Sequence, residues 1–492
     1  MKRSLIRLVA LCLGATLAHS QDLSSNLVVR DTVLANGLRV LVHPNPTVPS
    51  VSCRLFYATG SVHEHPGATG IAHMLEHMLF KGTRKVGVTD STQDAVFLPR
   101  IDSLNTLVKK ARNAGDTLQA RRLRKEMDSL SACHRKFFVK DELWQVLREK
   151  GGTGLNAFTT DVGTAYFVTL PPTEVELFYW LESDRMKNAV MRDFYAERDV
   201  VREERRLRYE NRPDGRYWES LERMFWEANP LGNPTIGWPS DIENYDRAMA
   251  EEHYKRYYGP QNAVLVLAGA IAPDSAFALA SRYFGPIPRG AVFPEVVTRD
   301  PDPAGQKRLL VTRDQAKPRM DLLFQTPSIL DPKAPAVEVL AGILSGQSGR
   351  LSTVLVDSLR LCTDAQAGHW AQANASVFVV RVTPAPGADP ARIEAEIWKI
   401  LESVRKQPVD ARELLRVKNQ VAMGKLRQMR DIESLATELG FDAIHGDWKL
   451  VNTFPEAVQK VDASQVQDAA NRFLLPERAT VGLLTNKPKE AR

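Results

Sequence analysis

The most informative stretch of this 492-residue sequence runs from Gly70 to Phe80 and reads GIAHMLEHMLF. It contains no proline, and its Ala, Met and Leu residues favour a helix. On a helix, His73 and His77 are one turn apart and project from the same face. Two neutral imidazoles placed in this way can share one tetrahedral Zn²⁺. Glu76 lies at the edge of that face, where its carboxylate can reach a water molecule without being a ligand.

A third ligand is expected in the charged segment from Glu197 to Glu204. These two acids are seven residues apart, which places them two turns apart on one helix face, whereas Glu203 points about 100° away. A ligand glutamate with a second glutamate that supports it suits a catalytic zinc site. Two histidines and one glutamate leave one coordination position for water. The alternative is that this charged helix is an ordinary solvated surface.

Short motifs also arise by chance, and a histidine on an apolar helix is more often a core residue than a ligand. The sequence holds ten histidines in all. His63 and His65 would share one side of a strand, but Pro66-Gly67 indicates a loop there, so we expect no metal role for them. The isolated histidines are interpreted as structural or surface residues: His134, His253, His369 and His445.

The composition is that of an ordinary globular protein, with 43% hydrophobic and 25% charged residues. It excludes a disordered chain, a collagen-like repeat and a disulfide mini-scaffold. The formal net charge of +6 is spread along the chain and is not typical of a nucleic-acid-binding protein. The sequence has four cysteines, and Cys12 lies in the N-terminal segment that we expect to be cleaved. The remaining three, Cys53, Cys133 and Cys362, lack metal-type spacing, so we interpret them as buried or spare thiols, although one disulfide bridge is possible.

Residues 1–20 are interpreted as a secretory signal peptide. Three basic residues precede an apolar run from Leu8 to Leu17, and Ala18-His19-Ser20 ends the segment, with cleavage expected before Gln21. The run is too short to span a bilayer comfortably, and no later stretch approaches a membrane span. We therefore expect a protein that is periplasmic or secreted and soluble after cleavage.

A proline-rich segment, residues 286–305, has the composition of a semi-rigid linker. The parts on either side, residues 21–285 and 306–492, end alike, with a helix, a short turn and a buried strand. At this length more than one core is expected, because cores stop growing at roughly 250–300 residues. The sequence thus predicts an α+β fold of two homologous halves. A charged segment at about 94–150 is expected to form a helical hairpin inserted in the first half.

Individual elements are also predicted. Asn36-Gly37 indicates a hairpin turn within residues 32–42. Strands are further expected at residues 51–57, at 155–170 as a pair, and at 263–268, 309–312, 320–325, 377–382 and 479–484. Helices are expected at residues 173–186, 335–344, 390–404 and 410–444, and one begins near Phe194.

Taken together, these features resemble the inverzincin family of zinc metallopeptidases that includes pitrilysin, insulin-degrading enzyme and the mitochondrial processing peptidase. The resemblance is strongest to its two-domain bacterial members and covers nearly all of the mature chain. The residues that carry it are 36–40, 60–64, 73–77 with Lys81-Gly82-Thr83, 151–159, 197–204 and 258–269.

This resemblance implies a metalloendopeptidase with one Zn²⁺ per chain. His73, His77 and Glu204 would be the ligands, and Glu76 would be the general base. Glu197 would be the family's second acid, which supports the site.

The resemblance also implies where a peptide substrate binds. Residues 154–159 look like the family's edge strand, which pairs with an extended peptide by β-augmentation. Asn156, Ala157 and Phe158 are therefore expected to bind substrate.

Two features depart from the family pattern. The 127 positions from His77 to Glu204 exceed the usual spacing, and the excess matches the helical insertion. Family members that act alone also carry an Arg, and a Tyr seven residues later, in the second domain, whereas those positions hold Val356 and Thr363 here. We therefore expect this chain to be the zinc-bearing subunit, with a second pitrilysin-like chain supplying the Arg/Tyr pair, or a homodimer.

Two other functions stay open. A non-catalytic assembly or peptide-binding subunit is favoured by the missing Arg/Tyr pair, but it has no need of the intact H-x-x-E-H motif. An unrelated zinc hydrolase that acts on non-peptide substrates is the more distant alternative.

Overall fold

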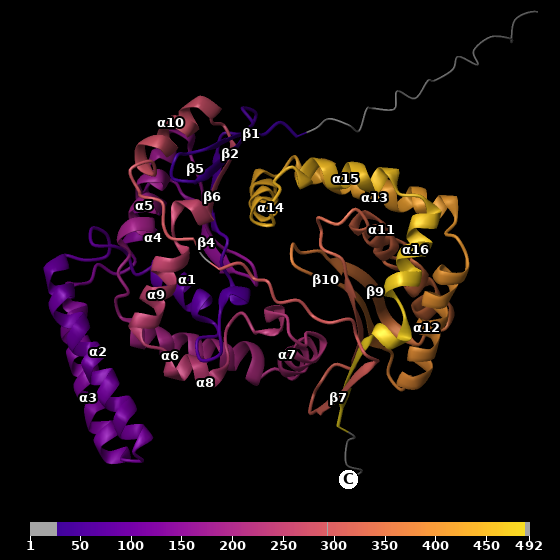
Figure 1. Cartoon of the computed structure of the whole chain (residues 1–492), viewed down its shortest axis with the longest axis horizontal. Coiled ribbons are helices and arrows are strands. Elements are labelled where there is room, and N and C mark those ends of the chain that lie inside the picture. Colours follow the sequence, from indigo (N-terminus) through magenta and orange to yellow (C-terminus); the bar gives the residue numbers. More distant parts are fainter. Residues whose placement is uncertain (1–26, 293, 488–492) are drawn as a thin grey trace, which may run out of the picture.

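The computed structural model describes residues 27–292 and 294–487, so the signal-peptide prediction for residues 1–20 lies outside the described residues. The described chain forms two halves, each built on one mixed β-sheet with helices packed against it (Figure 1). The predicted α+β fold of two homologous halves is confirmed. Among the described residues, none of the helices has both the length and the apolar character needed to cross a membrane.

The first half contains a six-stranded sheet in the order β1-β2-β6-β3-β5-β4, which leaves β4 at one edge. Only β2 and β6 are parallel, and the other neighbours are antiparallel. The predicted turn at Asn36-Gly37 joins β1 to β2. The strands are β1 (Arg30–Val33), β2 (Arg39–Pro44), β3 (Val51–Tyr57), β4 (Thr153–Thr159), β5 (Thr164–Leu170) and β6 (Ala263–Gly269).

Helix α1 (Ile71–Leu79) lies in the core of the first half, between β4 and β5 on one side and α6 and α9 on the other. Met74, Leu75, Met78 and Leu79 on it are fully buried. The other helices of this half are α2 (Ser91–Asn113), α3 (Thr117–His134), α4 (Glu142–Glu149), α5 (Val175–Asn188), α6 (Phe194–Arg205), α7 (Pro213–Phe225), α8 (Pro239–Asn244), α9 (Arg247–Tyr257) and α10 (Pro273–Tyr283).

Helices α2 and α3 form the predicted helical hairpin, which projects at one end of the molecule (Figure 1). Ion pairs anchor this hairpin to the rest of the first half. Arg124 on α3 contacts Asp199 on α6 at 2.7 Å, and Asp102 on α2 contacts Arg247 on α9 at 2.6 Å. The insertion therefore supports α6, the helix that carries the predicted acidic site residues.

The sheet of the second half has five strands, in the order β7-β11-β8-β10-β9, and among the described residues it repeats the first sheet without a counterpart of β1. The parallel pair β7–β11 corresponds to β2–β6, and the edge strand β9 corresponds to β4. The strands are β7 (Lys307–Arg313), β8 (Arg319–Thr326), β9 (Cys362–Trp370), β10 (Ser376–Pro384) and β11 (Thr480–Asn486). The helices are α11 (Ala334–Leu344), α12 (Pro390–Lys406), α13 (Ala411–Gln428), α14 (Ile432–Ile444), α15 (Leu450–Lys460) and α16 (Ala463–Phe473).

Two predictions for the second half need correction. The single helix expected at residues 410–444 is two helices, because Asp431 caps α14 by accepting a hydrogen bond from the backbone N–H of Glu433. Strand β9 was not predicted at all. Its sequence, CTDAQAGHW, lacks the alternation of apolar and polar residues that marks a half-buried strand.

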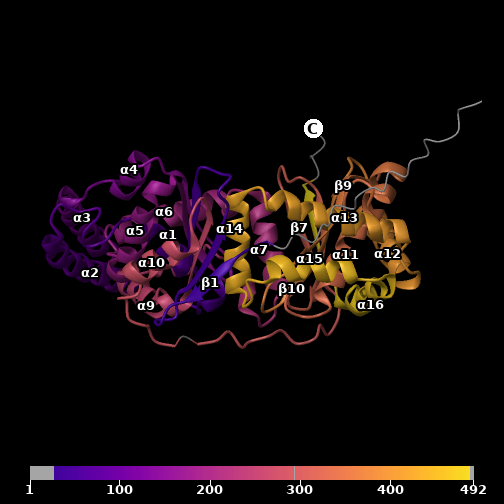
Figure 2. The same cartoon turned by 90° about the horizontal axis from the view of Figure 1, so that it is seen from above.

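Each half contributes one helix that packs on the sheet of the other half. Helix α14 of the second half packs on β3 and β6 of the first sheet, and α7 of the first half packs on β7 and β11 of the second. Leu435 and Leu439 on α14 join Phe56 in one apolar cluster, and Tyr217 and Leu221 on α7 belong to another. The segment between α10 and β7 runs along one side of the molecule (Figure 2).

Candidate metal centre

Helices α1 and α6 bring His73, His77 and Glu204 together. Nε2 of His73 lies 3.8 Å from Oε1 of Glu204, and Nε2 of His77 lies 3.4 Å from Oε2. One ligand atom from each residue lies within 4.8 Å of the other two. Within residues 27–292 and 294–487, no other group of three His, Cys, Asp or Glu side chains converges in this way.

Glu197 contacts His77 on the side of its ring that faces away from Glu204, so it is not part of this cluster. Its Oε1 accepts a hydrogen bond from Nδ1 of His77 at 2.8 Å, and its Oε2 lies 2.5 Å from Nζ of Lys81. Because a carboxylate cannot donate, Nδ1 carries the proton of this bond, and Nε2, the ring atom that faces Glu204, is the one that would bind a metal. Such a carboxylate–histidine pair orients a ligand in many metal sites.

The carboxylates give the cluster a field that attracts cations. Burial lowers the pKa of His77, but the neighbouring Glu197 and Glu204 outweigh it and raise that pKa to about 9. Burial raises the pKa of Glu197, but hydrogen bonds from His77 and Lys81 outweigh it and lower that pKa to about 2. A field that holds a proton on an imidazole also favours a divalent cation in its place.

His73 has a drier environment. Its side chain is buried, and among the described residues its Nδ1 has no hydrogen-bond partner. Burial lowers the pKa of His73 to about 4, so its imidazole is neutral at physiological pH. A neutral imidazole, a second oriented imidazole and a carboxylate are the donor set that Zn²⁺ prefers at catalytic sites, with one position left open. The residues present therefore fit a zinc ion.

Glu76 stands beside the cluster without belonging to it. Its Oε2 accepts a hydrogen bond of 2.7 Å from Oγ1 of Thr159, the last residue of β4. Burial raises the pKa of Glu76 above its usual value, and the Thr159 hydroxyl opposes this shift. A carboxylate with a raised pKa next to a cation site is suited to exchange protons during a reaction.

Strand β4 is the edge strand of the first sheet, and its last residue contacts the Glu76 carboxylate. Among residues 27–292 and 294–487, no strand pairs with the outer side of β4, and Asn156 is exposed there, while Ala157 is buried. The ring of Phe158 points to the far face of the sheet, where it stacks on Phe441 of α14 with 5.5 Å between centroids. Only the backbone of Phe158 is therefore available at the edge of the sheet.

Glu64 is a site residue that the spacing argument missed. Its carboxylate accepts hydrogen bonds from the backbone N–H groups of Gly70 at 2.6 Å and Ala72 at 2.9 Å, at the first turn of α1. Gly70 has a left-handed φ of +86°, and a Cβ there would lie 2.4 Å from a backbone oxygen of Ile236. An acid shortly before a helix start is the signal that could have identified this cap.

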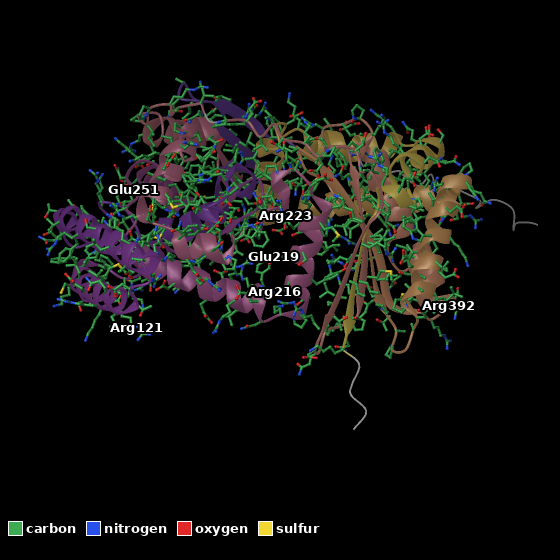
Figure 3. All side chains as sticks on the ribbon, turned by 60° about the horizontal axis from the view of Figure 1, so that its bottom comes forward. Arg121, Arg216, Glu219, Arg223, Glu251 and Arg392 are labelled. Atoms are coloured by element: carbon green, nitrogen blue, oxygen red, sulfur yellow. The ribbon has the colours of Figure 1, made fainter. Side chains whose placement is uncertain are left out.

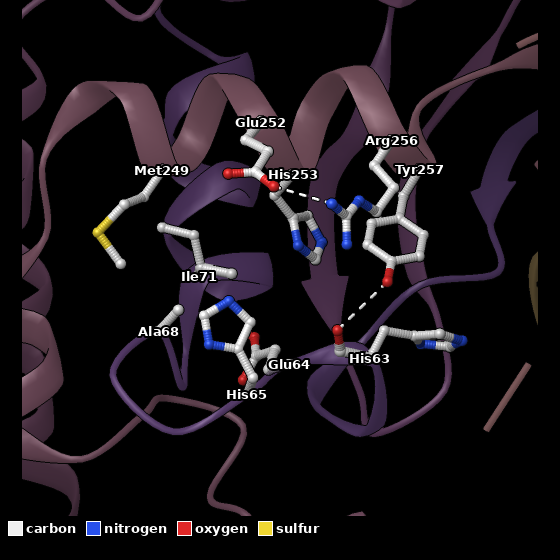
Figure 4. A pocket seen from close by; sticks show the side chains of 10 residues that line it. All are labelled: His63, Glu64, His65, Ala68, Ile71, Met249, Glu252, His253, Arg256 and Tyr257. Atoms are coloured by element: carbon white, nitrogen blue, oxygen red, sulfur yellow. Dashed lines mark hydrogen bonds and ion pairs between the residues drawn. The ribbon is translucent and has the colours of Figure 1, made fainter. Parts of the chain in front are cut away.

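A small cavity of about 100 Å³ adjoins Glu64 (Figure 4). His63, His65 and His253 line it, and His63 lies in a short 3-10 turn followed by a loop, as Pro66-Gly67 indicated. These three histidines do not converge on one point as the residues of the candidate metal centre do.

The positions expected for an Arg/Tyr pair lie in the second half. Val356 is in a helical turn, and Oγ1 of Thr363 donates to a backbone oxygen of β10. Arg350, shortly before them, forms a two-pronged ion pair with Glu413 at 2.9 and 2.7 Å. This arginine is thus engaged in holding its own half together.

Two family models match parts of this chain. Residues 39–93 match the family model described as Insulinase (Peptidase family M16), and residues 244–421 match the model described as Peptidase M16 inactive domain. The chain is 24% identical to the zinc protease PqqE of Helicobacter pylori, over 95% of this chain and 96% of that protein. It is 27% identical to an uncharacterised zinc protease of Mycobacterium bovis, over 94% of each chain.

Among solved structures, the chain resembles a protease from Helicobacter pylori with a TM-score of 0.78. The sequence identity is 22%, over 94% of this chain and all of that one. At this identity the likeness concerns the fold.

Proposed function

Because this chain belongs to the pitrilysin/insulinase family of peptidases, we propose that it is a zinc metalloendopeptidase that hydrolyses peptides or unfolded segments. One observation carries the proposal. Two imidazoles and a carboxylate converge within 4.8 Å, and a further carboxylate, that of Glu76, stands next to them outside the ligand set.

We assign metal binding, proton transfer and substrate binding to different residues of the chain. His73, His77 and Glu204 hold the metal, which when bound supplies the Lewis acidity that activates water and polarises the scissile carbonyl. Glu76 accepts a proton from the attacking water and returns it to the leaving amine. The unpaired edge of β4, at Asn156, Ala157 and Phe158, holds the peptide extended through backbone hydrogen bonds.

The substitution Glu76→Gln tests the role of the base. We expect the variant to bind one zinc ion with unchanged affinity and to lose peptide cleavage, because an amide cannot accept the proton. The matched control is Glu203→Gln on α6, an exposed acid paired with Arg206, which should cleave normally. Normal cleavage by zinc-loaded Glu76→Gln would contradict this mechanism.

We also propose that the chain is the metal-bearing subunit of a two-chain enzyme. Val356 and Thr363 stand where an Arg/Tyr pair is expected, and Arg350 is engaged with Glu413. A second pitrilysin-like chain that carries the pair, or a homodimer, would complete the site. Full peptidase activity of the purified single chain as a monomer would contradict this.

The same two positions favour the second candidate function, a non-catalytic assembly or peptide-binding subunit. A zinc titration separates the two functions. A peptidase should bind one zinc ion per chain, whereas a scaffold has no need of an intact ligand set. A chain that binds no zinc would favour the scaffold.

The protein is further proposed to be exported, to the periplasm or outside the cell. The basic start, the apolar run and Ala18-His19-Ser20 support this. N-terminal sequencing of the mature protein should give Gln21 as the first residue, and an intact Met1 would contradict export by this signal.

A further inference from the structure

The contact between the halves contains a buried carboxylate that does not belong to the metal centre. Asp321 on β8 is fully buried and accepts hydrogen bonds from Nε of Arg319 at 2.6 Å and Nε of Arg381 at 2.7 Å. The hydroxyl of Tyr217, on α7 of the other half, donates a third bond at 2.8 Å. One negative charge therefore holds two arginines side by side.

Each of these two arginines uses only its Nε in hydrogen bonds to protein atoms among the described residues. Both donate to Asp321 through Nε, and among the described residues their Nη groups donate to no protein atom. The two side chains keep 21% and 27% of their surface exposed. A guanidinium whose terminal nitrogens are free presents the paired donors that fit a carboxylate.

Two tryptophans fix the arginines in place. The guanidinium carbons of Arg319 and Arg381 each lie 5.0 Å from the ring centroid of Trp218 on α7. Trp370, at the end of β9, packs edge-on against Trp218 and keeps 42% of its surface exposed. We call these four residues the arginine–tryptophan cluster. Since the stacked guanidinium groups are already ordered, an anion that binds them costs little further ordering.

The carboxyl groups near the cluster are paired or have raised pKa values: Glu219 on α7 is paired with Arg205 at 2.6 Å, and burial raises the pKa of Asp161. Asp321 offsets one of the two arginines, and Asp214 on α7 is paired with Arg212 at 2.9 Å. Glu222 on α7 faces Arg381, but burial raises the pKa of Glu222 to about 8, so that it is largely neutral at pH 7. An uncompensated positive charge next to exposed aromatic surface favours an anion with an apolar flank.

The cluster adjoins the strand that ends at the metal centre. Trp370 lies two residues before Gln372, whose amide donates to Asp161 at 3.4 Å, in the turn after β4. Helix α7, which carries Trp218, follows shortly after α6, the helix that carries Glu204. It lies between the two halves (Figure 3). A peptide paired with β4 and continuing past Thr159 would run towards the cluster.

We propose that the arginine–tryptophan cluster binds a carboxylate of the peptide substrate, an inference that rests on the proposed peptidase function. The carboxylate would accept hydrogen bonds from the Nη groups of Arg319 and Arg381, with its apolar flank on Trp370. The enzyme would therefore prefer peptides in which an acidic side chain or the free C-terminus reaches the cluster while the cleaved bond lies at the metal centre.

Binding to zinc-loaded Glu76→Gln protein, which cannot cleave, tests the proposal by fluorescence anisotropy. Three versions of one peptide are compared: acidic with a free C-terminus, the same with Asp and Glu changed to Asn and Gln, and the same amidated at its C-terminus. We expect at least one neutralised version to bind tenfold or more weakly, and the version affected identifies the carboxylate. Equal binding of all three would overturn the proposal.

Substitutions in the same protein locate the preference. Arg381→Gln should abolish the preference, because it should weaken the binding of the acidic peptide alone. The control Arg392→Gln, on the exposed face of α12 (Figure 3), removes an equal charge and should leave the preference intact. Tyr217→Phe also removes a donor from Asp321 but keeps both guanidinium groups, so it should retain the preference. Loss of the preference in Tyr217→Phe, or its survival in Arg381→Gln, would overturn the proposal. Cleavage of the neutral peptide by the unsubstituted protein tests the peptidase function separately.

Discussion

The hydroxyl of Thr159 donates a hydrogen bond of 2.7 Å to Oε2 of Glu76. This contact joins the end of the edge strand β4 to the helix that carries the candidate ligands. Because the backbone of β4 is where we propose that the substrate pairs, the same residue sets the position of the peptide and of the proposed base. Misplacing either by about an ångström is costly in catalysis.

Removing this hydroxyl should therefore slow catalysis and leave metal binding unchanged. A hydrogen bond to a charged group contributes about 1.5–3 kcal/mol, so we expect Thr159→Val to lower kcat/KM by about tenfold or more. The control is Thr169→Val on β5, which removes a similar hydroxyl–carboxylate bond to Glu433 away from the site. Equal kcat/KM values for the two variants would show that the Thr159 hydroxyl has no part in the reaction.

The pair formed by Glu197 and His77 leads to a prediction about metal affinity. Glu197→Gln keeps the shape of the side chain but removes the charge that orients the Nδ1–H of His77. Loss of such a partner typically weakens metal binding by about 10–100-fold. Competition with a zinc chelator measures this directly, and Glu203→Gln on the same helix provides the matched control. An unchanged zinc affinity in Glu197→Gln would remove this residue from the metal centre.

Much of the site could be predicted because it depends on local periodicity. His73, Glu76 and His77 lie within five residues of one helix, so the 3.6-residue repeat is enough to place the two imidazoles on one face. Glu204 is different, since the repeat relates it to Glu197 but does not say which helix α6 packs against. The family resemblance supplied that relation, and the fold brings the two helices together.

Other features had no local pattern to reveal them. Asp321, Arg319 and Arg381 meet because β8 and β10 are neighbours, a long-range pairing that no spacing records. The break between α13 and α14 depends on one capping aspartate, Asp431, within a sequence that is otherwise helical. Strand β9 is stabilised by pairing with β10 rather than by its own composition.

Glu222 should make the stability of the protein depend on pH. Burial raises its pKa from 4.5 to about 8, so between these values the folded state holds a proton that the unfolded state has released. The free energy of unfolding should therefore fall as the pH rises through this window. Glu222→Gln cannot ionise, so its stability should fall less between pH 5 and pH 8. The side chain is half-buried, so solvent screening reduces the expected difference to about 1–3 kcal/mol.

Denaturant unfolding at a series of pH values measures this dependence. The control is Glu227→Gln, an exposed acid just after α7, which should follow the unsubstituted protein. A Glu222→Gln variant whose stability changed with pH as steeply as that of the unsubstituted protein would show that Glu222 ionises normally in the folded state.

The packing of α14 on the first sheet depends on the absence of a side chain at Gly440. A Cβ at this position would lie 2.0 Å from a ring carbon of Phe56, which is fully buried between Phe158 and Phe441. Overpacking of this kind costs about 1–3 kcal/mol, and that cost should exceed the gain that alanine normally brings to a helix. We therefore expect Gly440→Ala to lower the free energy of unfolding. Gly424→Ala on α13, where a Cβ would meet nothing within 4 Å, should instead raise it by about 0.5–1 kcal/mol. If both substitutions stabilised the protein, the close contact between α14 and Phe56 would not exist in solution.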